Sequence, residues 1–329
     1  MKKRVAINGL GRIGRNFLKL ALEKNLDIIA VNDLTDPKNL AYLLKYDSVY
    51  GVWNKKIEAG SNFLKIDNKK ILVLKEKDPA SLPWKMLNID VVIESTGFFT
   101  EQADKHLKAG AKKVIITAPC KNNQITIVPG INDNLLKNQT IISVASCTTN
   151  CFAPVAHILN QEFGIEKGFM TTVHAYTADQ KLQDAPHEKY RRGRAATENL
   201  VPTTSGVLSA ISQVIPELKG KIDGLAIRAP VICGSIMDFS VMLKKPVSVK
   251  EINAVLQKYS QKYKNIMEYS EDELVSRDII NNPHSCIIDS LSTQIIEDKN
   301  GKGNLAKVLA WYDNEFGYSN RLVDVVEML

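Results

Sequence analysis

Residues 4–14 read RVAINGLGRIG, in which a short run of β-type residues leads into the pattern Gly9-x-Gly11-x-x-Gly14. Behind the glycines, residues 13–21 place apolar side chains at the spacing of a helix that buries one face. Glycines here permit a tight turn and a close approach of the backbone to a pyrophosphate, and the helix N-terminus adds N–H donors and partial positive charge. The segment predicts the strand–turn–helix unit of a dinucleotide-binding α/β domain. The alternative is a glycine-rich turn with only a structural role.

An acidic residue strengthens this prediction. Asp33 directly follows a second expected strand at residues 27–32 and lies 19 positions after Gly14. A carboxylate at this place can accept hydroxyls of an adenine ribose, and it repels a ribose 2′-phosphate. No arginine occupies residues 34–36. The sequence therefore favours NAD over NADP.

The first half of the chain alternates expected strands and helices, which is the pattern of a parallel sheet covered on both faces. Short apolar runs predict further strands at residues 71–74, 91–93, 114–116 and 141–145.

After about residue 147 the pattern changes, because apolar side chains recur at every second position from Met237 to Leu243. This period indicates an antiparallel sheet with one face partly in solvent. Other expected elements are strands at residues 169–176 and 306–312, a helix at 248–263 and a last helix at 318–329 that could pack on either domain. We expect an α/β chain with a dinucleotide-binding domain at residues 1–147 and an α+β domain with a mainly antiparallel sheet at residues 148–317.

Composition places the chain among globular proteins. Of its 329 residues, 44% are hydrophobic and 24% charged, which excludes disordered, collagen-like and coiled-coil classes. No apolar run approaches the roughly 18 residues of a membrane span and no export signal follows the basic start, so we expect a cytoplasmic protein with no membrane partner. The net charge of +7 comes from scattered basic residues, densest at residues 190–194, without a zinc-finger or RNA-binding motif. Nucleic acid is therefore not predicted as a partner.

Cys147 is a candidate nucleophile. It stands in the run ASCTTNC, residues 145–151, between an expected strand and an expected helix. A helix N-terminus stabilises a thiolate against an ordinary thiol pKa of about 8.5, and the neighbouring hydroxyls suit an anion. The alternative is a buried structural thiol, which we expect for Cys151 one turn later. Five cysteines without an export signal predict no disulfide framework, and no second Cys or His pair completes a metal site, so no metal is expected.

His174 is the candidate base for this thiol. On the expected strand it shares a face with Thr172 and Tyr176, and a cysteine nucleophile is commonly paired with a histidine that is distant in sequence. The sequence alone leaves a structural role for His174 equally open. His106, among lysines, is expected at the solvated surface, and His157 is expected to be structural.

These stretches, together with residues 311–319 (WYDNEFGYS), resemble the phosphorylating glyceraldehyde-3-phosphate dehydrogenases over essentially the whole chain. The resemblance implies a Rossmann domain followed by a catalytic domain, with the terminal helix returning to the first domain. It also implies a homotetramer, one NAD per subunit, and oxidation of glyceraldehyde 3-phosphate with inorganic phosphate to 1,3-bisphosphoglycerate.

The resemblance also assigns roles to residues that match the family motifs. Cys147 is the implied nucleophile and His174 the implied base. The implied cofactor-binding residues are Gly9, Gly11, Arg12, Ile13, Asp33, Lys77, Thr117, Asn314 and Tyr318. The implied contacts of the substrate phosphate and inorganic phosphate are Ser146, Thr148, Thr177, Arg192, Ser205, Gly206 and Arg228.

Some positions depart from the family pattern. Residues 229–235 lack the usual Thr-Pro-Asn, which leaves the details of that loop open, and Ser205 replaces threonine but keeps the hydroxyl. Ala185 stands where leucine is common in strictly NAD-specific members, so use of NADP stays open. The alternative functions are erythrose-4-phosphate dehydrogenase activity and a non-catalytic binding role on the same scaffold.

Overall fold

A computed structural model describes residues 2–120 and 124–329, and the chain divides into two compact units. The first unit comprises residues up to Ile127, Asp133–Ala145 and Ser319–Leu329, and the second comprises Val128–Asn132 and Ser146–Tyr318. This division into compact units has a boundary at residues 145 and 146, next to the predicted domain boundary at residue 147. It does not test the roles predicted for the two domains.

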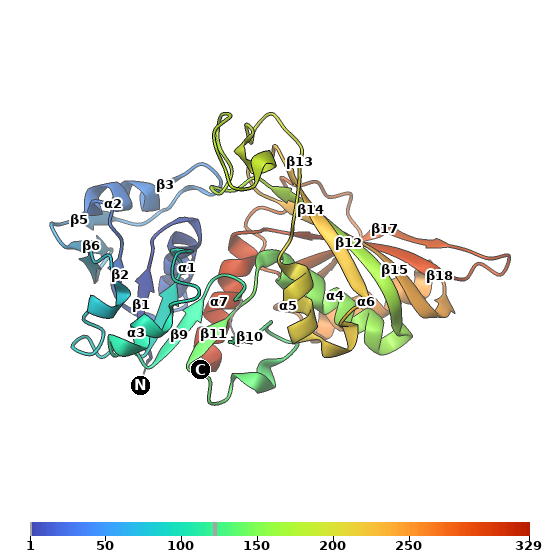
Figure 1. The fold of residues 1–329 in the computed structure, drawn as a ribbon, viewed down its shortest axis with the longest axis horizontal. Helices are drawn as coiled ribbons and strands as arrows, with labels where there is room; N and C mark the ends of the chain where they lie inside the picture. The colour runs from blue at the N-terminus through green and yellow to red at the C-terminus, as the bar shows by residue number, and fades with distance from the viewer. Residues whose placement is uncertain (1, 121–123) are drawn as a thin grey trace. The chain divides into compact units, whose positions relative to one another are not determined.

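Nine described strands of the first unit form one sheet in the order β10-β11-β9-β8-β1-β2-β7-β6-β5 (Figure 1). The strands from β10 to β7 are parallel to their neighbours, and β6 and β5 continue the sheet in antiparallel fashion. Their bounds are β1 Arg4–Asn8, β2 Asp27–Asn32, β5 Ile57–Ala59, β6 Phe63–Ile66, β7 Lys69–Leu74, β8 Val91–Glu94, β9 Lys113–Ile116, β10 Ile125–Thr126 and β11 Ile141–Ser143. The predicted parallel sheet is confirmed.

Helices and short elements complete this unit. Helix α1 starts at the glycine turn and buries Phe17 and Leu20. The helical elements are α1 Arg12–Glu23, α2 Pro37–Lys45, α3 Asp104–Lys108, η1 Pro79–Ser81 and η2 Asp133–Leu136, and β3 Tyr46–Asp47 pairs with β4 Gly51–Val52. The Lys3 ammonium donates to the Val326 carbonyl at 2.9 Å, within the same unit.

The second unit is built on a sheet with the order β13-β14-β12-β15-β18-β17-β16. The bounds of its elements are β12 Ile165–Ala175, β13 Val201–Thr203, β14 Ile222–Ala229, β15 Ser235–Val247, β16 Met267–Ser270, β17 Cys286–Ile296, β18 Gly303–Tyr312, α4 Cys147–Phe163, α5 Val207–Val214, α6 Val249–Lys262, η3 Tyr190–Gly193 and η4 Pro216–Leu218. The last helix, α7, spans Phe316–Met328, two residues earlier than predicted at its start. The sheet is mainly antiparallel as predicted, although β12 pairs with β14, and β16 with β17, in parallel.

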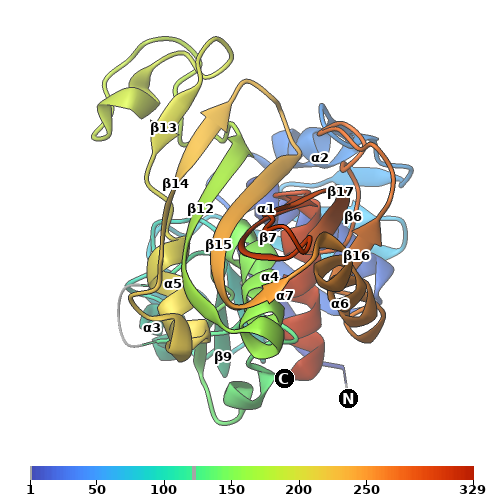
Figure 2. The same cartoon turned by 90° about the vertical axis from the view of Figure 1, so that its right-hand side faces the viewer.

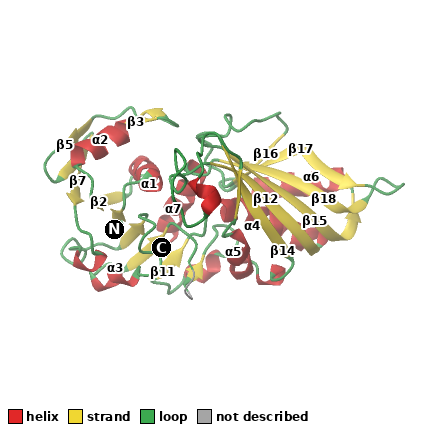
Figure 3. Cartoon of the chain, turned by 45° about the horizontal axis from the view of Figure 1, so that its top comes forward, coloured by secondary structure: helices red, strands yellow, loops and turns green. Residues whose placement is uncertain are grey.

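Helix α4 packs on one face of the second sheet, behind β12 and β15 in Figure 2. The ring of Phe152 on α4 meets the ring of Phe239 on β15 edge to face, with centroids 4.8 Å apart. Figure 3 shows β14, β12, β15, β18 and β17 as neighbouring strands. The other face of this sheet keeps apolar side chains exposed, among them Phe169 and Leu225. His174 alternates with Phe169 and Val173 along β12 and is buried on the α4 side.

The prediction that His106 lies at the solvated surface is wrong, since this side chain is fully buried. The indole Nε1 of Trp84, which can only donate, lies 3.0 Å from His106 Nδ1, so Nδ1 accepts and the ring proton sits on Nε2. Nε2 then donates to Glu94 Oε2 at 2.9 Å. A polar sequence context misled the prediction, because a short helix can turn one polar residue inward where partners satisfy it.

The network continues across the ends of three strands. Asn8 ends β1 and lies opposite Asn32 of β2 and Glu94 of β8. Its Nδ2 donates to Glu94 Oε2 at 2.6 Å, and its Oδ1 accepts from Asn32 Nδ2 at 2.7 Å. Asn32 in turn exchanges two hydrogen bonds with the Glu76 backbone after β7. We call the side chains of Trp84, His106, Glu94, Asn8 and Asn32 the strand-end network.

Within the described ranges, no helix combines the length and apolar character needed to cross a bilayer.

We expect His106→Ala to lower the free energy of unfolding by about 3 kcal/mol, because it leaves the buried Trp84 indole N–H without an acceptor and removes one of the donors to the buried Glu94 carboxylate. Urea unfolding would measure this change. Lys108→Ala, at an exposed position of the same helix, is the control and should stay within about 0.5 kcal/mol of the parent. A loss below about 1 kcal/mol for His106→Ala would mean that water replaces both hydrogen bonds.

Candidate functional site

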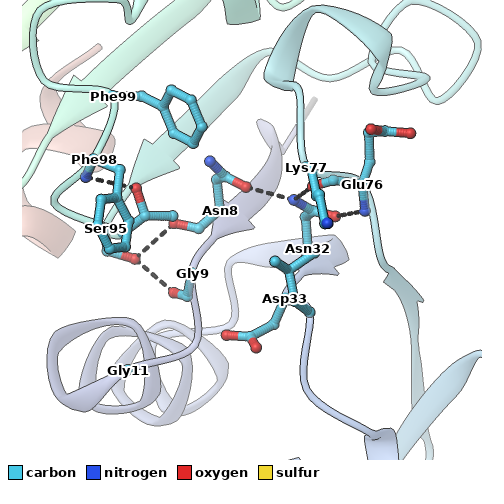
Figure 4. Close-up of a pocket in the computed structure, with 12 residues that line it drawn as sticks. Asn8, Gly9, Gly11, Asn32, Asp33, Glu76, Lys77, Ser95, Phe98 and Phe99 are labelled. Carbon is cyan, nitrogen blue, oxygen red and sulfur yellow. Dashed lines mark hydrogen bonds between the residues drawn. The ribbon is translucent and has the colours of Figure 1, made fainter.

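A cavity of about 370 Å³ opens at the carboxyl ends of the parallel strands of the first unit (Figure 4). It lies where β1 is flanked by β8 on one side and β2 on the other, which is the usual ligand position in such sheets. The residues that line it are Asn8, Gly9, Gly11, Asn32, Asp33, Leu34, Glu76, Lys77, Ser95, Thr96, Phe98 and Phe99.

The glycines meet different geometric demands. Gly9 has a φ of +92°, and a Cβ there would approach the Thr96 nitrogen to 2.8 Å. A Cβ on Gly14 would lie 2.1 Å from the Gly9 carbonyl oxygen, so the helix can pack this close only with glycine. A Cβ on Gly11 would meet nothing within 4 Å. Open space therefore lies in front of α1, as a bound phosphate group would need.

The N-terminus of α1 suits an anion for a second reason. Gly11 is its N-cap and offers no side chain to the first turn, and that turn carries no acidic residue. The first turn of α1 itself thus carries no carboxylate that would offset the partial positive charge of the helix end. The cavity and helix end together fit the pyrophosphate of a dinucleotide.

Asp33 is held firmly at the cavity. Its Oδ2 accepts the Leu10 N–H at 2.8 Å and its Oδ1 accepts the Thr35 N–H at 2.9 Å. A carboxylate has about four acceptor positions, so both oxygens keep capacity for ribose hydroxyls. In Figure 4 the carboxylate points toward the α1 turn that carries Gly11.

Of the predicted cofactor residues, Gly9, Gly11, Asp33 and Lys77 line this cavity. Arg12, Ile13 and Thr117 lie in the same unit but are not among its lining residues, and Asn314 and Tyr318 belong to the second unit. The Arg12 guanidinium pairs with Asp47 at 2.7 Å and lies over the Tyr50 ring, so only its backbone is directed to the turn.

The sequence did not predict the other residues that line the cavity, among them Asn8 and Asn32 at its floor and Phe98 and Phe99 at its rim. Asn8 and Asn32 carried a usable signal, since each is the last residue of its strand beside a predicted ligand residue. The rings of Phe98 and Phe99 carried none, because a pair of aromatic residues after a strand is equally typical of a core.

In the second unit, Cys147 is the first residue of α4, which confirms the predicted position at a helix N-terminus. Ser146 is the N-cap, and its Oγ accepts the Thr149 N–H at 3.1 Å. Cys151, one turn later, is fully buried as predicted, and its thiol points to the Ala310 carbonyl.

The thiol and the predicted base are neighbours. His174 Nε2 lies 3.4 Å from Cys147 Sγ, and His174 Nδ1 lies 2.6 Å from the Ala175 carbonyl oxygen. A carbonyl only accepts, so this short contact favours the tautomer with the ring proton on Nδ1, in which Nε2 presents its lone pair to the thiol. In that tautomer Arg228 Nη1, although it lies 3.0 Å from Nδ1, donates to the Ala175 carbonyl and to Thr177 Oγ1 instead. This is the tautomer that a general base requires.

The charge state differs from the expectation that a helix end makes Cys147 a thiolate. Burial raises the pKa of the Cys147 thiol, and the Arg228 guanidinium opposes this rise without reversing it. Burial, reinforced by the charge of Arg228, lowers the pKa of His174 to about 3. At neutral pH the pair is therefore a thiol beside a neutral imidazole, because desolvation outweighs the Arg228 charge and the hydrogen bonds that lower the thiol pKa.

Tyr312 supports this pair and was missed at the sequence level as an individual residue. Its ring meets the His174 ring edge to face, with centroids 6.0 Å apart. Its buried hydroxyl joins Thr148 Oγ1 at 2.9 Å to Thr172 Oγ1 at 2.8 Å. The aromatic start of the 311–319 motif was the only available signal.

The predicted phosphate contacts fall into two groups. Arg228 Nη1 lies 3.0 Å from His174 Nδ1 and donates to Thr177 Oγ1 at 3.3 Å, so Thr177 and Arg228 adjoin the thiol–imidazole pair. Arg192 is instead engaged elsewhere, with its Nη1 on Asp179 at 2.5 Å and its Nε on Thr203 Oγ1 at 2.9 Å. Ser205 and Gly206 precede α5, whose N-cap Gly206 supplies no capping side chain. No group of three or more His, Cys, Asp or Glu within residues 2–120 and 124–329 is arranged to hold a metal ion.

Comparison with known proteins agrees in both units. Residues 3–102 match the family model described as glyceraldehyde 3-phosphate dehydrogenase, NAD binding domain, and residues 146–314 match that of the C-terminal domain. A glyceraldehyde-3-phosphate dehydrogenase of Borreliella burgdorferi is 52% identical over 337 residues, covering 99% of both chains. That of Geobacillus stearothermophilus is 49% identical, covering 99% of this chain and 97% of the relative. Glyceraldehyde-3-phosphate dehydrogenase 1 of Bacillus subtilis is 50% identical with the same coverage.

Because the pKa of His174 is lowered in the folded protein, the free energy of unfolding should fall as the pH is lowered. An unfolded histidine takes up a proton near pH 6.5, whereas folded His174 does not until about pH 3, so acidification favours the unfolded state. Between pH 6.5 and 4.5 the free energy of unfolding of the parent should therefore fall by about 2 kcal/mol more than that of His174→Gln. Chemical unfolding across this range measures it.

His187→Gln, which removes a histidine from the surface loop, is the control and should change the slope far less. Parallel loss of stability in the parent and in His174→Gln would show that folded His174 accepts the proton.

Proposed function

Because the chain belongs to the glyceraldehyde-3-phosphate dehydrogenase family, we propose that it oxidises D-glyceraldehyde 3-phosphate to 1,3-bisphosphoglycerate with NAD and inorganic phosphate. The observation that carries this proposal is the 3.4 Å approach of His174 Nε2 to Cys147 Sγ, in the tautomer that can take a proton. A family fold without this pair would support a binding role only. Membership makes the chain an NAD-dependent oxidoreductase of glycolysis.

We assign cofactor binding to residues of both sequence halves. The backbone of Gly9, Gly11, Arg12 and Ile13 would hold the pyrophosphate, since the open helix end favours an anion there. Asp33 would accept the adenine ribose hydroxyls, and Lys77 would lie by the adenine. The family pattern assigns the nicotinamide contacts to Thr117, Asn314 and Tyr318. NAD, when bound, accepts the hydride that leaves the substrate carbon.

The first step is attack of Cys147 Sγ on the aldehyde carbon. A sulfur–carbon bond forms, the carbonyl π bond breaks, and the thiol proton passes to His174 Nε2. Both groups start neutral, so proton transfer accompanies attack and does not precede it. The resulting oxyanion would accept from the Cys147 backbone N–H and from the newly protonated Nε2.

His174 also serves the later steps. After giving the first proton to the oxyanion, Nε2 can take the hydroxyl proton back as the substrate carbon is oxidised to a thioester on Cys147. A phosphate oxygen then attacks the thioester carbon, the carbon–sulfur bond breaks, and the sulfur leaves as thiolate and is reprotonated. One residue thus acts as acid and base in alternation.

Two anions must be held for this chemistry, the substrate phosphate and the attacking phosphate. Arg228 and Thr177 adjoin the thiol–imidazole pair and offer charged and hydroxyl donors. The other proposed phosphate contacts are Ser146, Thr148, Arg192, Ser205 and Gly206. Arg192 would have to share its guanidinium between phosphate and Asp179, to which it is already bound.

We further propose that residues 1–147 with the helix 318–329 serve the cofactor, and that residues 148–317 serve the substrate. A homotetramer is supported by family resemblance and by the exposed apolar side chains, such as Phe169 and Leu225, on one face of the second sheet. We also propose a location in the cytoplasm, as expected from the sequence. Erythrose 4-phosphate stays the alternative substrate, and relative kcat/KM on the two aldehydes, with and without inorganic phosphate, decides between them.

We expect Cys147→Ser to lower phosphate-dependent turnover by at least about 10³-fold, because the hydroxyl is a far poorer nucleophile beside a neutral imidazole. The Kd for NAD should change by less than about twofold. Steady-state kinetics and titration calorimetry measure the two quantities. Cys151→Ser removes a thiol one helical turn away and should keep activity; the reverse outcome, an active Cys147→Ser and a dead Cys151→Ser, would overturn the assignment.

We expect Asp33→Asn to reduce the preference for NAD over NADP. Two unit charges about 4 Å apart repel by roughly 4 kcal/mol at an effective dielectric of 20, and solvent screening leaves part of this, so the ratio of kcat/KM values should fall on the order of 10²-fold. Asp36→Asn, at the nearby N-cap of α2, is the matched control. A parent enzyme that uses NADP as well as NAD would show that Asp33 does not decide the choice.

A further inference from the structure

Ser235 occupies a position where three strands of the second sheet end together. It is the first residue of β15, is fully buried, and lies opposite Tyr312, the last residue of β18. Its Oγ accepts the N–H of Ala175, the last residue of β12, at 3.1 Å. The same Oγ lies 2.9 Å from Asn314 Oδ1, two residues beyond β18. One hydroxyl therefore joins three strand ends.

These contacts fix the orientation of the Asn314 side-chain amide. The Gly234 N–H, which can only donate, points to the same atom at 3.2 Å, so that atom must be the carbonyl oxygen Oδ1. Ser235 Oγ already accepts from Ala175, which leaves its hydrogen to be donated to Oδ1. Oδ1 is bonded to these two donors and also lies 3.8 Å from Cys233 Sγ, so the Nδ2 group faces the other way. None of the described residues accepts a hydrogen bond from Nδ2 in the contacts of this structure, although Asn314 is only 5% exposed.

The backbone of residue 234 can place its N–H on Asn314 Oδ1 only because this residue is glycine. Gly234 has a φ of +89°, and a Cβ there would come within 2.1 Å of the Ser276 carbonyl oxygen. Residues 233–235 belong to the stretch that departs from the family pattern. This stretch therefore forms a cradle for Asn314, with a backbone N–H and a hydroxyl on one oxygen.

The same hydroxyl reaches the thiol–imidazole pair. The carbonyl of Ala175 accepts from His174 Nδ1 and lies 3.2 Å from Arg228 Nη1. The backbone N–H of the same residue, Ala175, donates to Ser235 Oγ. The base and the Asn314 amide are thus positioned by one shared group.

We propose that Ser235 is a positioning residue that locks the Asn314 amide with Nδ2 as its available donor, and thereby selects the carbonyl oxygen of a carboxamide on the nicotinamide ring. This inference rests on the proposed function, which places Asn314 at the nicotinamide. Its consequence is selective: loss of the Ser235 hydroxyl weakens recognition of the nicotinamide and not of the adenosine part.

Ser235→Ala tests this by direct binding, measured by titration calorimetry with NAD and with ADP-ribose, which lacks the nicotinamide. We expect the Kd for NAD to rise about tenfold, since the amide loses its hydrogen bond from Ser235 and is then held less firmly, by the Gly234 N–H. The Kd for ADP-ribose should change by less than about twofold. Asn314→Ala should give the same pattern, and the double variant should bind NAD no more weakly than Asn314→Ala alone.

Ser290→Ala is the matched control, because Ser290 is also a buried sheet residue whose hydroxyl donates to a backbone carbonyl, that of Ser270. It should destabilise the fold to a similar degree in urea unfolding while leaving both Kd values unchanged. Equal weakening of NAD and ADP-ribose by Ser235→Ala would indicate a general structural loss and overturn the proposal. Unchanged binding of both, or additive effects of the two variants, would also overturn it.

Failure of the inference can be told apart from failure of the proposed function. A parent protein that binds NAD but responds to Ser235→Ala in one of these contrary ways overturns the inference alone. A parent protein that binds no NAD overturns the proposed function and, with it, the inference.

Discussion

A single carbonyl group, that of Ala175, decides what the reactive pair can do. By accepting from His174 Nδ1 at 2.6 Å it confines the ring proton to that nitrogen, and only then does Nε2 present a lone pair to Cys147. Arg228 approaches the same nitrogen and helps keep the ring uncharged. The cation therefore has an effect before any ligand is bound, because it helps to keep His174 in the neutral form that can accept a proton.

The fold and the positions of Cys147 and His174 within it could be predicted because each rests on local rules. The spacing of Gly9, Gly11 and Gly14 follows from turn geometry, and the polar run around Cys147 follows from the needs of a helix N-terminus. The strand that carries His174 was predicted from its composition. Each of these features is determined by residues that are close together in the sequence.

The remaining features depend on neighbours in space. The buried position of His106 requires Trp84 and Glu94, which lie 22 and 12 residues away. The neutral state of the thiol–imidazole pair depends on the burial of both groups and on the charge of Arg228. The ion pair of Arg192 depends on Asp179. Neither the burial of a charged group nor the identity of its distant partner leaves a pattern in the sequence. Sequence motifs therefore could not predict these features.

The strand-end network has a consequence for how the cavity above it behaves. Asn8 and Asn32 are tied to each other and, through Glu94 and the Glu76 backbone, to the ends of four strands. A floor built in this way is ordered before any ligand arrives, so little conformational entropy is left to lose on association. Discrimination between ligands then arises at the rim, where Phe98 is largely exposed, while the floor acts as a preformed template.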